Sequence, residues 1–556
     1  MKKQVAEIIQ KALKTQELEL TVEEIESKIE IPPSNEMGDF ALPCFFLAEK
    51  LKENPHQIAL NLREKIGNTS QDFDDIQTSG PYINFFVNRG NLTLNIVKEI
   101  LKQKEKYGYQ NIGKGKKALV EHTSINPNAS PHVGRARNAI IGDSIVKILD
   151  FLNFKTEVHY YVNDVSKQIA MLVVANAEKK TFDEMLQVYI NISKKVEKNP
   201  EIEQQVFSWL RRFEGGDKEA LRKFKKITET CIKGQKEILK KIGINYYNFD
   251  YESLYIKKSK KILEEFKAKK KLHKDKDGRL YLDQNDTNLK KMMKSAVLVL
   301  TRSDETGLYP LRDLAYTIDK MKKSEKNIVV LGEDQKLYFL QLQEALKLLN
   351  EKAPEVVHYS FILLKSKGKS KKMSTRKGDV VLLEDFLDEV TKKAEVEIKK
   401  RKTKGDSKKV AIAAIKYKTL KNSPNKIINF DLEEALQFEG DTGPYLLYSY
   451  ARAKSILRKA EKFSDLKISK LEDSEVNLIK KLSEFPYIVM SSYNTLNPSL
   501  IANYSYQLAQ TFNEFYHKCQ VVGEEEESFR LSLVKAFAQV LKNSLSLLGI
   551  ETLEEM

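Results

Sequence analysis

The sequence predicts a chain of several domains, in which an α/β domain with a parallel sheet lies between a small α+β domain and an all-α bundle. Three observations lead to this prediction. A length of 556 residues corresponds to about three or four domains of ordinary size. From Ala118 the chain follows the order strand, turn, helix, strand, with which a parallel sheet begins. After Val380 the hydrophobic pattern is helical almost to the end.

The α+β domain is expected at residues 1–110. Helix-like segments run from Phe40 to Lys52 and from Gln57 to Ile66. Tyr82–Val87 follows Gly80 and Pro81 and has the composition of a strand. The loop at residues 108–117 contains three glycines and is expected to end this domain.

The α/β domain is expected at residues 111–420 and the α-helical bundle at residues 421–556. The first strand is expected at residues 118–124, the first helix at 135–154 and the second strand at 157–162. The Lys- and Glu-rich stretch from about 167 to 276 is interpreted as a helical insertion. Strand-like segments at 296–300 and 327–331 are expected to resume the sheet.

Composition narrows the class of protein. Lys and Arg number 94 against 78 Asp and Glu, so the net charge of +16 suits a polyanionic partner, although a solubility role explains it equally well. No apolar run approaches the ~18 residues of a membrane span, and the amphipathic start does not read as a signal peptide. Three distant cysteines suggest a reducing cytoplasm and no structural zinc. Nothing demands more than a monomer.

The first candidate motif is His132-Val133-Gly134-Arg135, at the start of the first long helix. A helix N-terminus offers unpaired N–H groups and partial positive charge, so it attracts anions such as a nucleotide phosphate. A histidine adds a donor, and a glycine lets a base or ribose approach the backbone. Taken alone, the pattern more often marks a surface or capping histidine.

The second motif, Lys371-Lys372-Met373-Ser374-Thr375-Arg376-Lys377-Gly378, has the composition of a basic loop. Such a loop can close over a triphosphate and neutralise the charge that develops as pyrophosphate departs. Taken alone, it is more often a solvated surface loop.

The third motif places Tyr309 and Asp313 four residues apart, which puts both on one face of a helix. A phenol and a carboxylate there can converge on a cationic substrate group. In the simpler interpretation Asp313 offsets the neighbouring Arg312.

Together these motifs resemble the class I aminoacyl-tRNA synthetases, and most closely the arginyl-tRNA synthetase family. Ordered matches run through most of the chain: residues 37–43, 80–85, 126–128, 137–143, 308–315, 332–335 and 438–452. Two positions depart from the family signatures. Arg135 stands where the first signature usually ends in His, and Thr375 is the fourth residue of the second. Arg135 can still donate to a phosphate, and Arg376 and Lys377 can replace the missing lysine.

The resemblance implies a Rossmann-like catalytic domain, an N-terminal domain that binds the tRNA core and a helical anticodon-binding domain. It implies ATP-dependent ligation of L-arginine to its cognate tRNA through arginyl-adenylate, with release of AMP and pyrophosphate. ATP is then a substrate, and Mg²⁺ is expected on its phosphates. The catalytic residues implied are His132, Gly134, Arg135, Lys372, Ser374 and Arg376. The ATP-binding residues implied are His132, Gly134, Lys372, Met373 and Lys377.

The resemblance also implies binding sites for arginine and tRNA. A guanidinium presents five donors in a plane, so its pocket needs acceptors. The implied arginine-binding residues are Glu121, Ser124, Asn126, Tyr309, Asp313 and Gln335. The implied tRNA-binding residues are Asn84, Tyr445, Tyr448 and Arg452. The last three share a helical face, a pattern that without the resemblance indicates a buried aromatic stripe.

Two alternatives remain open from the sequence. Another class I synthetase is the nearer one, but a cysteinyl enzyme needs zinc-binding cysteines, and enzymes for hydrophobic amino acids have no use for Glu121 and Asp313. The other alternative is a tRNA-binding paralogue without catalysis, in which Arg135 and Thr375 mark the loss.

Overall fold

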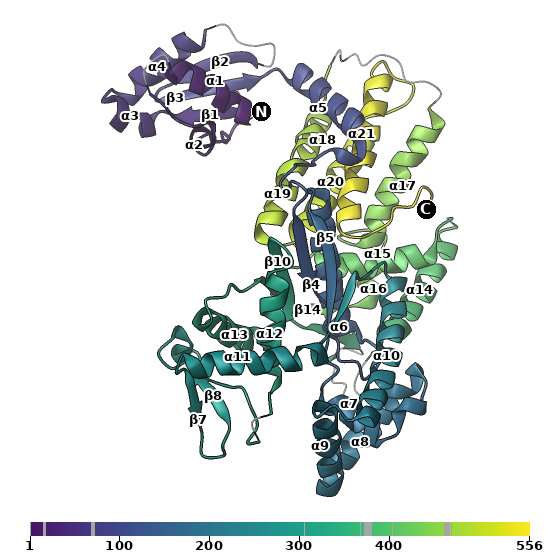
Figure 1. Ribbon diagram of the computed structural model, residues 1–556. Coiled ribbons are helices and arrows are strands. Elements are labelled where there is room, and N and C mark those ends of the chain that lie inside the picture. The colour runs from purple at the N-terminus through teal and green to yellow at the C-terminus, as the bar shows by residue number, and fades with distance from the viewer. Residues whose placement is uncertain are drawn as a thin grey trace. The chain divides into compact units, whose positions relative to one another are not determined.

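The computed structural model describes residues 2–14, 18–67, 73–304, 306–366, 369–371, 381–402, 404–460, 468 and 470–556 (Figure 1). It separates into two compact units. The first comprises residues 1–103, 460–483 and 514–536, and the second comprises residues 104–459, 484–513 and 537–556.

The first unit contains a three-stranded antiparallel sheet and several helices. The strand order is β1 (Phe40–Pro43), β3 (Tyr82–Val87), β2 (Phe73–Ser79). The helices are α1 (Lys2–Lys14), α2 (Val22–Glu26), α3 (Phe45–Leu51), α4 (Pro55–Ile66), α5 (Arg89–Gln103) and α18 (Asp473–Ser483). α1, α4 and the sheet share one apolar core.

The helix expected over residues 40–52 is wrong in its first part. Phe40–Pro43 is instead an edge strand, in which Leu42 pairs with Ile83 and is fully buried. A proline inside a helix removes a hydrogen bond and clashes with the preceding turn, so a helix does not continue through Pro43. Pro43 is instead the last residue of the edge strand, and α3 starts beyond it. The strand expected at Tyr82–Val87 is confirmed.

The second unit is organised by a five-stranded parallel sheet. Its strand order is β11 (Glu355–Tyr359), β10 (Lys326–Gly332), β4 (Lys117–Glu121), β5 (Lys155–Val162), β6 (Asn248–Tyr251). α6 (Val133–Phe151) connects β4 to β5, and the order then reverses, with β10 on the other side of β4. In open parallel sheets this reversal creates a crevice at the carboxyl ends of the strands, where ligands bind.

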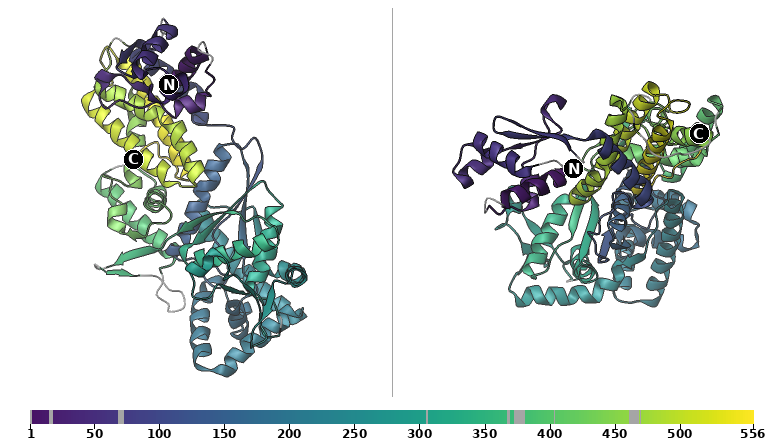
Figure 2. Two further views of the ribbon diagram at one scale, coloured as in Figure 1. Left: turned by 90° about the vertical axis from the view of Figure 1, so that its left-hand side faces the viewer. Right: turned by 90° about the horizontal axis from the view of Figure 1, so that it is seen from above.

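Four helices form the first part of the expected insertion and pack on one another (Figure 2). They are α7 (Lys167–Val174), α8 (Phe182–Lys198), α9 (Pro200–Glu214) and α10 (Lys218–Lys241). Asn199 caps α9 and Pro200 occupies its first turn, a position where a missing N–H costs nothing. The chain then returns to the parallel sheet as β6, so the stretch from 167 to 276 is not one continuous insertion.

The segment at residues 296–300 does not resume the parallel sheet, which corrects that prediction. It forms β9 (Val297–Val299) in a separate antiparallel sheet with β7 (Leu272–Lys274) and β8 (Leu280–Asp283). Helix α11 (Ile256–Ala268) precedes this sheet, and α12 (Tyr309–Met321) follows it. A short apolar run indicates a buried strand but does not say to which sheet it belongs.

The remainder is mainly helical, as predicted. After α13 (Lys336–Leu348) the helices are α14 (Leu383–Lys400), α15 (Ser407–Leu420), α16 (Leu432–Ala435), α17 (Gly443–Lys459), α19 (Phe485–Thr495), α20 (Ser499–Lys518) and α21 (Glu527–Leu547). The exception is β14 (Ile428–Phe430), which pairs with β12 (Ile362–Ser366), itself paired with β13 (Lys369–Lys371). Within the described ranges, no helix is both long and apolar enough to cross a bilayer.

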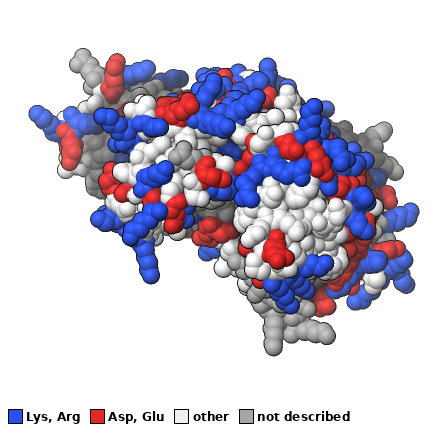
Figure 3. Space-filling view, turned by 60° about the horizontal axis from the view of Figure 1, so that its bottom comes forward, with Lys and Arg blue, Asp and Glu red and all other residues white. Residues whose placement is uncertain are grey.

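Acidic and basic side chains are mixed on the surface shown in Figure 3, where Lys and Arg surround uncharged areas and Asp and Glu lie between them. Charged side chains of the second unit also pair locally, as Lys180 does with Glu184 and Lys117 with Glu157. The positive net charge therefore does not by itself point to one binding face.

Candidate active site

A cavity of about 500 Å³ opens at the carboxyl ends of the parallel strands. Glu121 ends β4, Gly332 ends β10 and Tyr359 ends β11, and all three line the cavity. It thus occupies the crevice that the strand order predicts. It is also lined by all six residues predicted to bind arginine: Glu121, Ser124, Asn126, Tyr309, Asp313 and Gln335.

The cavity holds two carboxylates in different settings. Glu121 is 5% exposed, and its Oε2 lies 2.5 Å from the Nζ atom of Lys320. Asp313 accepts hydrogen bonds from the hydroxyls of Tyr338 at 2.7 Å and Thr317 at 3.4 Å. Burial raises the pKa of Asp313, although the Lys320 ammonium and the Tyr338 hydroxyl oppose that rise. A cationic ligand would favour the ionised form.

Helix α12 carries Tyr309 and Asp313 on one face, as their spacing predicted. Pro310 in its first turn needs no hydrogen-bond partner for its nitrogen, which explains why the helix starts there. The Tyr309 ring lies 5.0 Å from that of Tyr338, and half of Tyr309 remains exposed.

Three buried polar atoms on the cavity wall have no hydrogen-bond partner among the residues that the structure describes. They are Ser124 Oγ, Tyr161 OH and Asn163 Oδ1. A buried polar atom without a partner costs free energy, about 1–3 kcal/mol. Their convergence on one cavity indicates that a polar ligand completes the site.

An unusual turn brings Ser124 to the cavity. Thr123 and Ser124 have φ values of +83° and +40°, which L-residues rarely adopt. The Asn138 side chain holds this turn, because its Oδ1 accepts the Thr123 N–H at 2.7 Å and its Nδ2 donates to the Val330 carbonyl at 2.8 Å. The strand expected to reach Ser124 therefore ends at Glu121.

The chain that follows the basic loop is joined to the start of α6, where the first nucleotide motif lies. The Val133 N–H, at the start of α6, donates to the Val381 carbonyl at 3.1 Å, and the Leu383 N–H donates to the Pro131 carbonyl at 2.8 Å. The candidate residues of the loop itself, Lys372, Met373, Ser374, Arg376 and Lys377, lie outside the described residues.

His132 is the N-cap of α6 but makes no side-chain capping bond. Burial and the neighbouring Arg135 lower the pKa of His132 to about 4. The ring is therefore neutral near pH 7 and donates through one nitrogen. Gly134 occupies the first turn, and Arg135 lines the cavity.

Sequence reasoning missed several residues of the cavity. Asn163 directly follows a predicted strand and Tyr338 lies three residues after Gln335, so position alone could have suggested both. Asn138 and Tyr161 carried no such signal. Lys320, buried behind Glu121, lies seven residues after Asp313, a spacing that places it on the same helical face.

The residues predicted to bind tRNA are not gathered in the cavity. Tyr445, Tyr448 and Arg452 are half-buried on one face of α17. Asn513 of α20 donates to the Tyr445 hydroxyl at 2.7 Å and accepts from Arg452 Nη1. The Arg452 guanidinium lies 4.8 Å from the centre of the Tyr448 ring.

Asn84 lies in the central strand of the three-stranded sheet and is only 7% exposed. A side chain so buried offers little surface to a nucleic acid. Its predicted tRNA contact therefore gains no support from this geometry.

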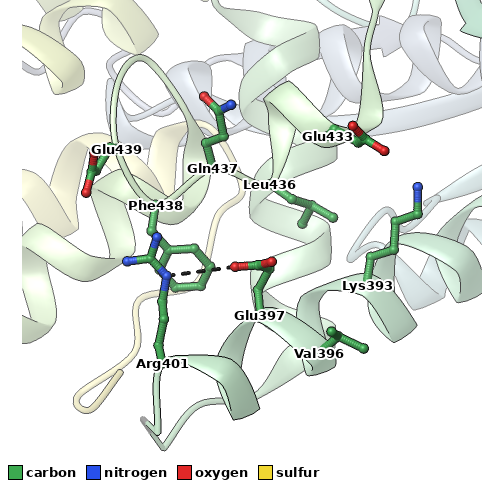
Figure 4. Close-up of a pocket in the computed structure, with 9 residues that line it drawn as sticks. All are labelled: Lys393, Val396, Glu397, Arg401, Glu433, Leu436, Gln437, Phe438 and Glu439. Carbon is green, nitrogen blue, oxygen red and sulfur yellow. Dashed lines mark ion pairs between the residues drawn. The ribbon is translucent and has the colours of Figure 1, made fainter.

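A second, larger cavity of about 610 Å³ lies between α14 and the segment after α16 (Figure 4). The Arg401 guanidinium lies over the Phe438 ring, 4.5 Å from its centre, and faces Glu397 at 4.0 Å. None of the predicted site residues lines this cavity. The smaller cavity at β4 is therefore the better candidate for the chemistry.

Three family profiles match the chain in order. The "Arginyl tRNA synthetase N terminal domain" matches residues 1–87, "tRNA synthetases class I (R), catalytic domain" matches 96–432 and the "DALR anticodon binding domain" matches 446–556.

Curated relatives and solved structures agree with these matches. An arginine–tRNA ligase of Clostridium perfringens is 36% identical and covers 100% of both chains, and one of Methanocaldococcus jannaschii is 36% identical over 95% of both. The Thermus thermophilus arginyl-tRNA synthetase structure has a TM-score of 0.80 at 24% identity, covering 100% of both chains. The Plasmodium falciparum arginyl-tRNA synthetase has a TM-score of 0.75 at 22% identity, covering 100% of this chain and 99% of that one. These two likenesses concern the fold.

Proposed function

The chain belongs to the arginyl-tRNA synthetase family, and we propose that its arginine substrate binds in the cavity at the carboxyl end of β4. Its activity is the ATP-dependent ligation of L-arginine to tRNA. The observation that carries the proposal is the gathering of the six residues predicted to bind arginine around one cavity with two carboxylates.

The two carboxylates are the acceptors for the guanidinium. Glu121 and Asp313 face the cavity from different elements, β4 and α12, so they can meet different edges of the planar group. Tyr309 packs on the aliphatic part of the substrate. Ser124, whose hydroxyl has no protein partner, and Asn126 hold the α-amino end, and Gln335 is the weaker candidate.

The start of α6 and the basic loop form the nucleotide side of the site. The arginine carboxylate attacks the α-phosphorus of ATP, a new oxygen–phosphorus bond forms, and the bond to pyrophosphate breaks. This carboxylate is already ionised near neutral pH, so no protein general base is needed. His132, Gly134 and Arg135 hold the nucleotide, and the loop containing Lys372 stabilises the charge on the departing pyrophosphate.

The second step transfers the acyl group from arginyl-adenylate to the terminal ribose 2′-hydroxyl of tRNA, and AMP leaves. Mg²⁺ is proposed to arrive with the ATP phosphates. Among the described residues, no cluster of His, Cys, Asp or Glu forms a metal cage.

Recognition of tRNA is assigned to the face of α17 that carries Tyr445, Tyr448 and Arg452, where aromatic rings and a guanidinium can stack on unpaired bases. The contact at Asn84 is kept as a weaker part of the proposal. We also propose that the protein acts as a cytoplasmic monomer. The cysteines Cys44, Cys231 and Cys519 are buried free thiols, which fits a reducing compartment.

Arginine-dependent exchange of pyrophosphate into ATP, measured with and without tRNA for arginine, tests this function. Exchange that requires arginine and is stimulated by tRNA supports it. A protein that binds tRNA but shows no exchange with arginine under either condition would contradict it and favour a paralogue that has lost catalysis.

A further inference from the structure

A buried lysine pairs with one of the two carboxylates of the cavity. Lys320 Nζ lies 2.5 Å from Glu121 Oε2, and the two side chains are only 4% and 6% exposed. Lys320 does not line the cavity, so it approaches Glu121 from behind, with its ammonium 4.6 Å from the centre of the Tyr316 ring. The mechanism above gives this cation no role.

The charges of the site do not balance without Lys320. Two carboxylates carry two negative charges, and the guanidinium of one arginine supplies a single positive charge. An unpaired charge in a buried site is costly, because the protein interior solvates it poorly. Lys320 supplies the second cation: its ion pair with Glu121 leaves the pair of carboxylates with a net charge of −1.

We propose that Lys320 is the built-in counter-cation of the arginine cavity, which matches its two carboxylates to a substrate side chain with one positive charge. This inference rests on the proposed function, because it takes Glu121 and Asp313 as the guanidinium acceptors. Lys320 is a positioning residue and does not touch the substrate.

Lys320 is the cation that acts on both carboxylates, Glu121 and Asp313, and the nearby charged groups have other partners or positions. It is the cation that lowers the pKa of Asp313, and it pairs directly with Glu121. Asp250 already pairs with His159 and Lys323. Arg135 lines the cavity at the nucleotide motif. Glu252, of the short helix Glu252–Tyr255, also acts on Asp313 and is paired with Arg312 of α12. The remaining titratable groups around the carboxylates are tyrosines: Tyr309 and Tyr316 of α12, Tyr161 of β5, Tyr338 of α13 and Tyr255 of that short helix.

Removal of Lys320 should couple arginine binding to proton release. Two carboxylates would then face each other without a cation, and one of them takes up a proton in the empty cavity. Asp313 is the expected site, since burial already raises its pKa. Arginine must displace this proton to solvent, so its affinity rises with pH.

The effect of Lys320 on arginine binding should reverse when Glu121 loses its charge. In Glu121→Gln, Lys320 is left unpaired and cancels the charge of Asp313, so a guanidinium enters a cavity without net charge. Removing Lys320 as well restores a single negative charge. The same lysine therefore helps arginine binding in the presence of Glu121 and hinders it in its absence.

Isothermal titration of the full chain with L-arginine tests both consequences. Titrations in two buffers of different ionisation enthalpy, at the same pH, count the protons released. Lys320→Met should release more protons than wild type or Lys320→Arg, by up to about one, and should bind arginine at least about tenfold more weakly. Glu121→Gln/Lys320→Met should bind at least about tenfold more tightly than Glu121→Gln.

The matched control is Lys416→Met, which removes another buried lysine, one that pairs with Asp143 of α6. It should lower the melting temperature without additional proton release on arginine binding. Unchanged affinity and no additional proton release in Lys320→Met would overturn the proposal. If Lys320→Met does not fold, the double variant Glu121→Gln/Lys320→Met provides the test. A double variant that binds arginine no more tightly than Glu121→Gln would also overturn the proposal. Wild type that fails to bind arginine would instead contradict the proposed function.

Discussion

The arginine cavity and the aromatic face of α17 were both predicted as binding surfaces, yet they are built in opposite ways. On the cavity wall, Ser124, Tyr161 and Asn163 carry buried polar atoms without protein partners. On α17, Tyr445 and Arg452 already bond to Asn513 of α20. The cavity is thus organised in advance for a ligand, whereas RNA bases at α17 must compete with internal contacts.

The largest expected effect follows from the cavity. Asp313→Ala should lower arginine-dependent pyrophosphate exchange about a thousandfold, because a buried guanidinium would lose a charged acceptor at a cost of about 4 kcal/mol. ATP binding should be largely retained. Asp319→Ala is the control, because Asp319 lies on the same helix and pairs with Lys258 near the surface. Equal activity in both variants would remove Asp313 from the site.

The next largest effect is expected in the stability of the protein at acid pH, which depends on a buried histidine. Burial lowers the pKa of His122, which is 1% exposed, to about 4. In the unfolded chain His122 takes up a proton near its ordinary pKa of 6.5, whereas in the folded chain it does not. The stability is therefore present above about pH 6.5 and is lost as the pH falls towards 4. The loss should reach about 3 kcal/mol, order of magnitude, at this one group.

Denaturant unfolding between pH 7 and 4.5 measures this loss. His122→Gln should unfold with a shallower dependence on pH, whatever its stability at pH 7. Parallel curves for wild type and variant would show that His122 does not carry the effect.

Glu121→Gln should be milder than Asp313→Ala, because Lys320 already occupies one oxygen of Glu121. The Michaelis constant for arginine should rise about ten- to a hundredfold, which corresponds to about 1.4–2.7 kcal/mol, with a smaller change in kcat. A selective fall in kcat would show that Glu121 acts on the reacting atoms instead of the side chain of the substrate.

The smallest effect is expected at α17. Replacing Tyr445 and Tyr448 together by Ala should weaken tRNA binding about tenfold, because a stacked base contributes about 1–3 kcal/mol and part of this replaces internal contacts. If the face is only packing, the melting temperature should fall instead while tRNA affinity stays unchanged. Both quantities measured on one preparation separate these outcomes, and the second would leave the cavity as the one supported surface of the two.

Local patterns predicted much of the second unit. Hydrophobic periodicity located α6, and the spacing of Tyr309 and Asp313 placed both on one face of α12. All six arginine-binding candidates reached one cavity because they follow strand ends or lie on a helix beside them.

Contacts between residues far apart in the sequence could not be predicted from local patterns. Residues 297–299 form a strand as expected, but pairing with β8 depends on a chain direction that no local pattern records. The positive φ of Thr123 runs against the preference of a β-branched residue and depends on the distant Asn138 side chain. Lys320 has no motif of its own, and its role follows only from its contact with Glu121.

We expect the carboxylates of the cavity to select a cationic amino acid. Titration calorimetry with L-arginine and L-citrulline measures this selectivity directly. Citrulline has nearly the same shape as arginine but carries no charge. The account predicts that wild type binds arginine and binds citrulline at least about a hundredfold more weakly, and that Asp313→Asn removes most of this preference. Equal affinities for the two ligands in wild type, or an undiminished preference in Asp313→Asn, would contradict it.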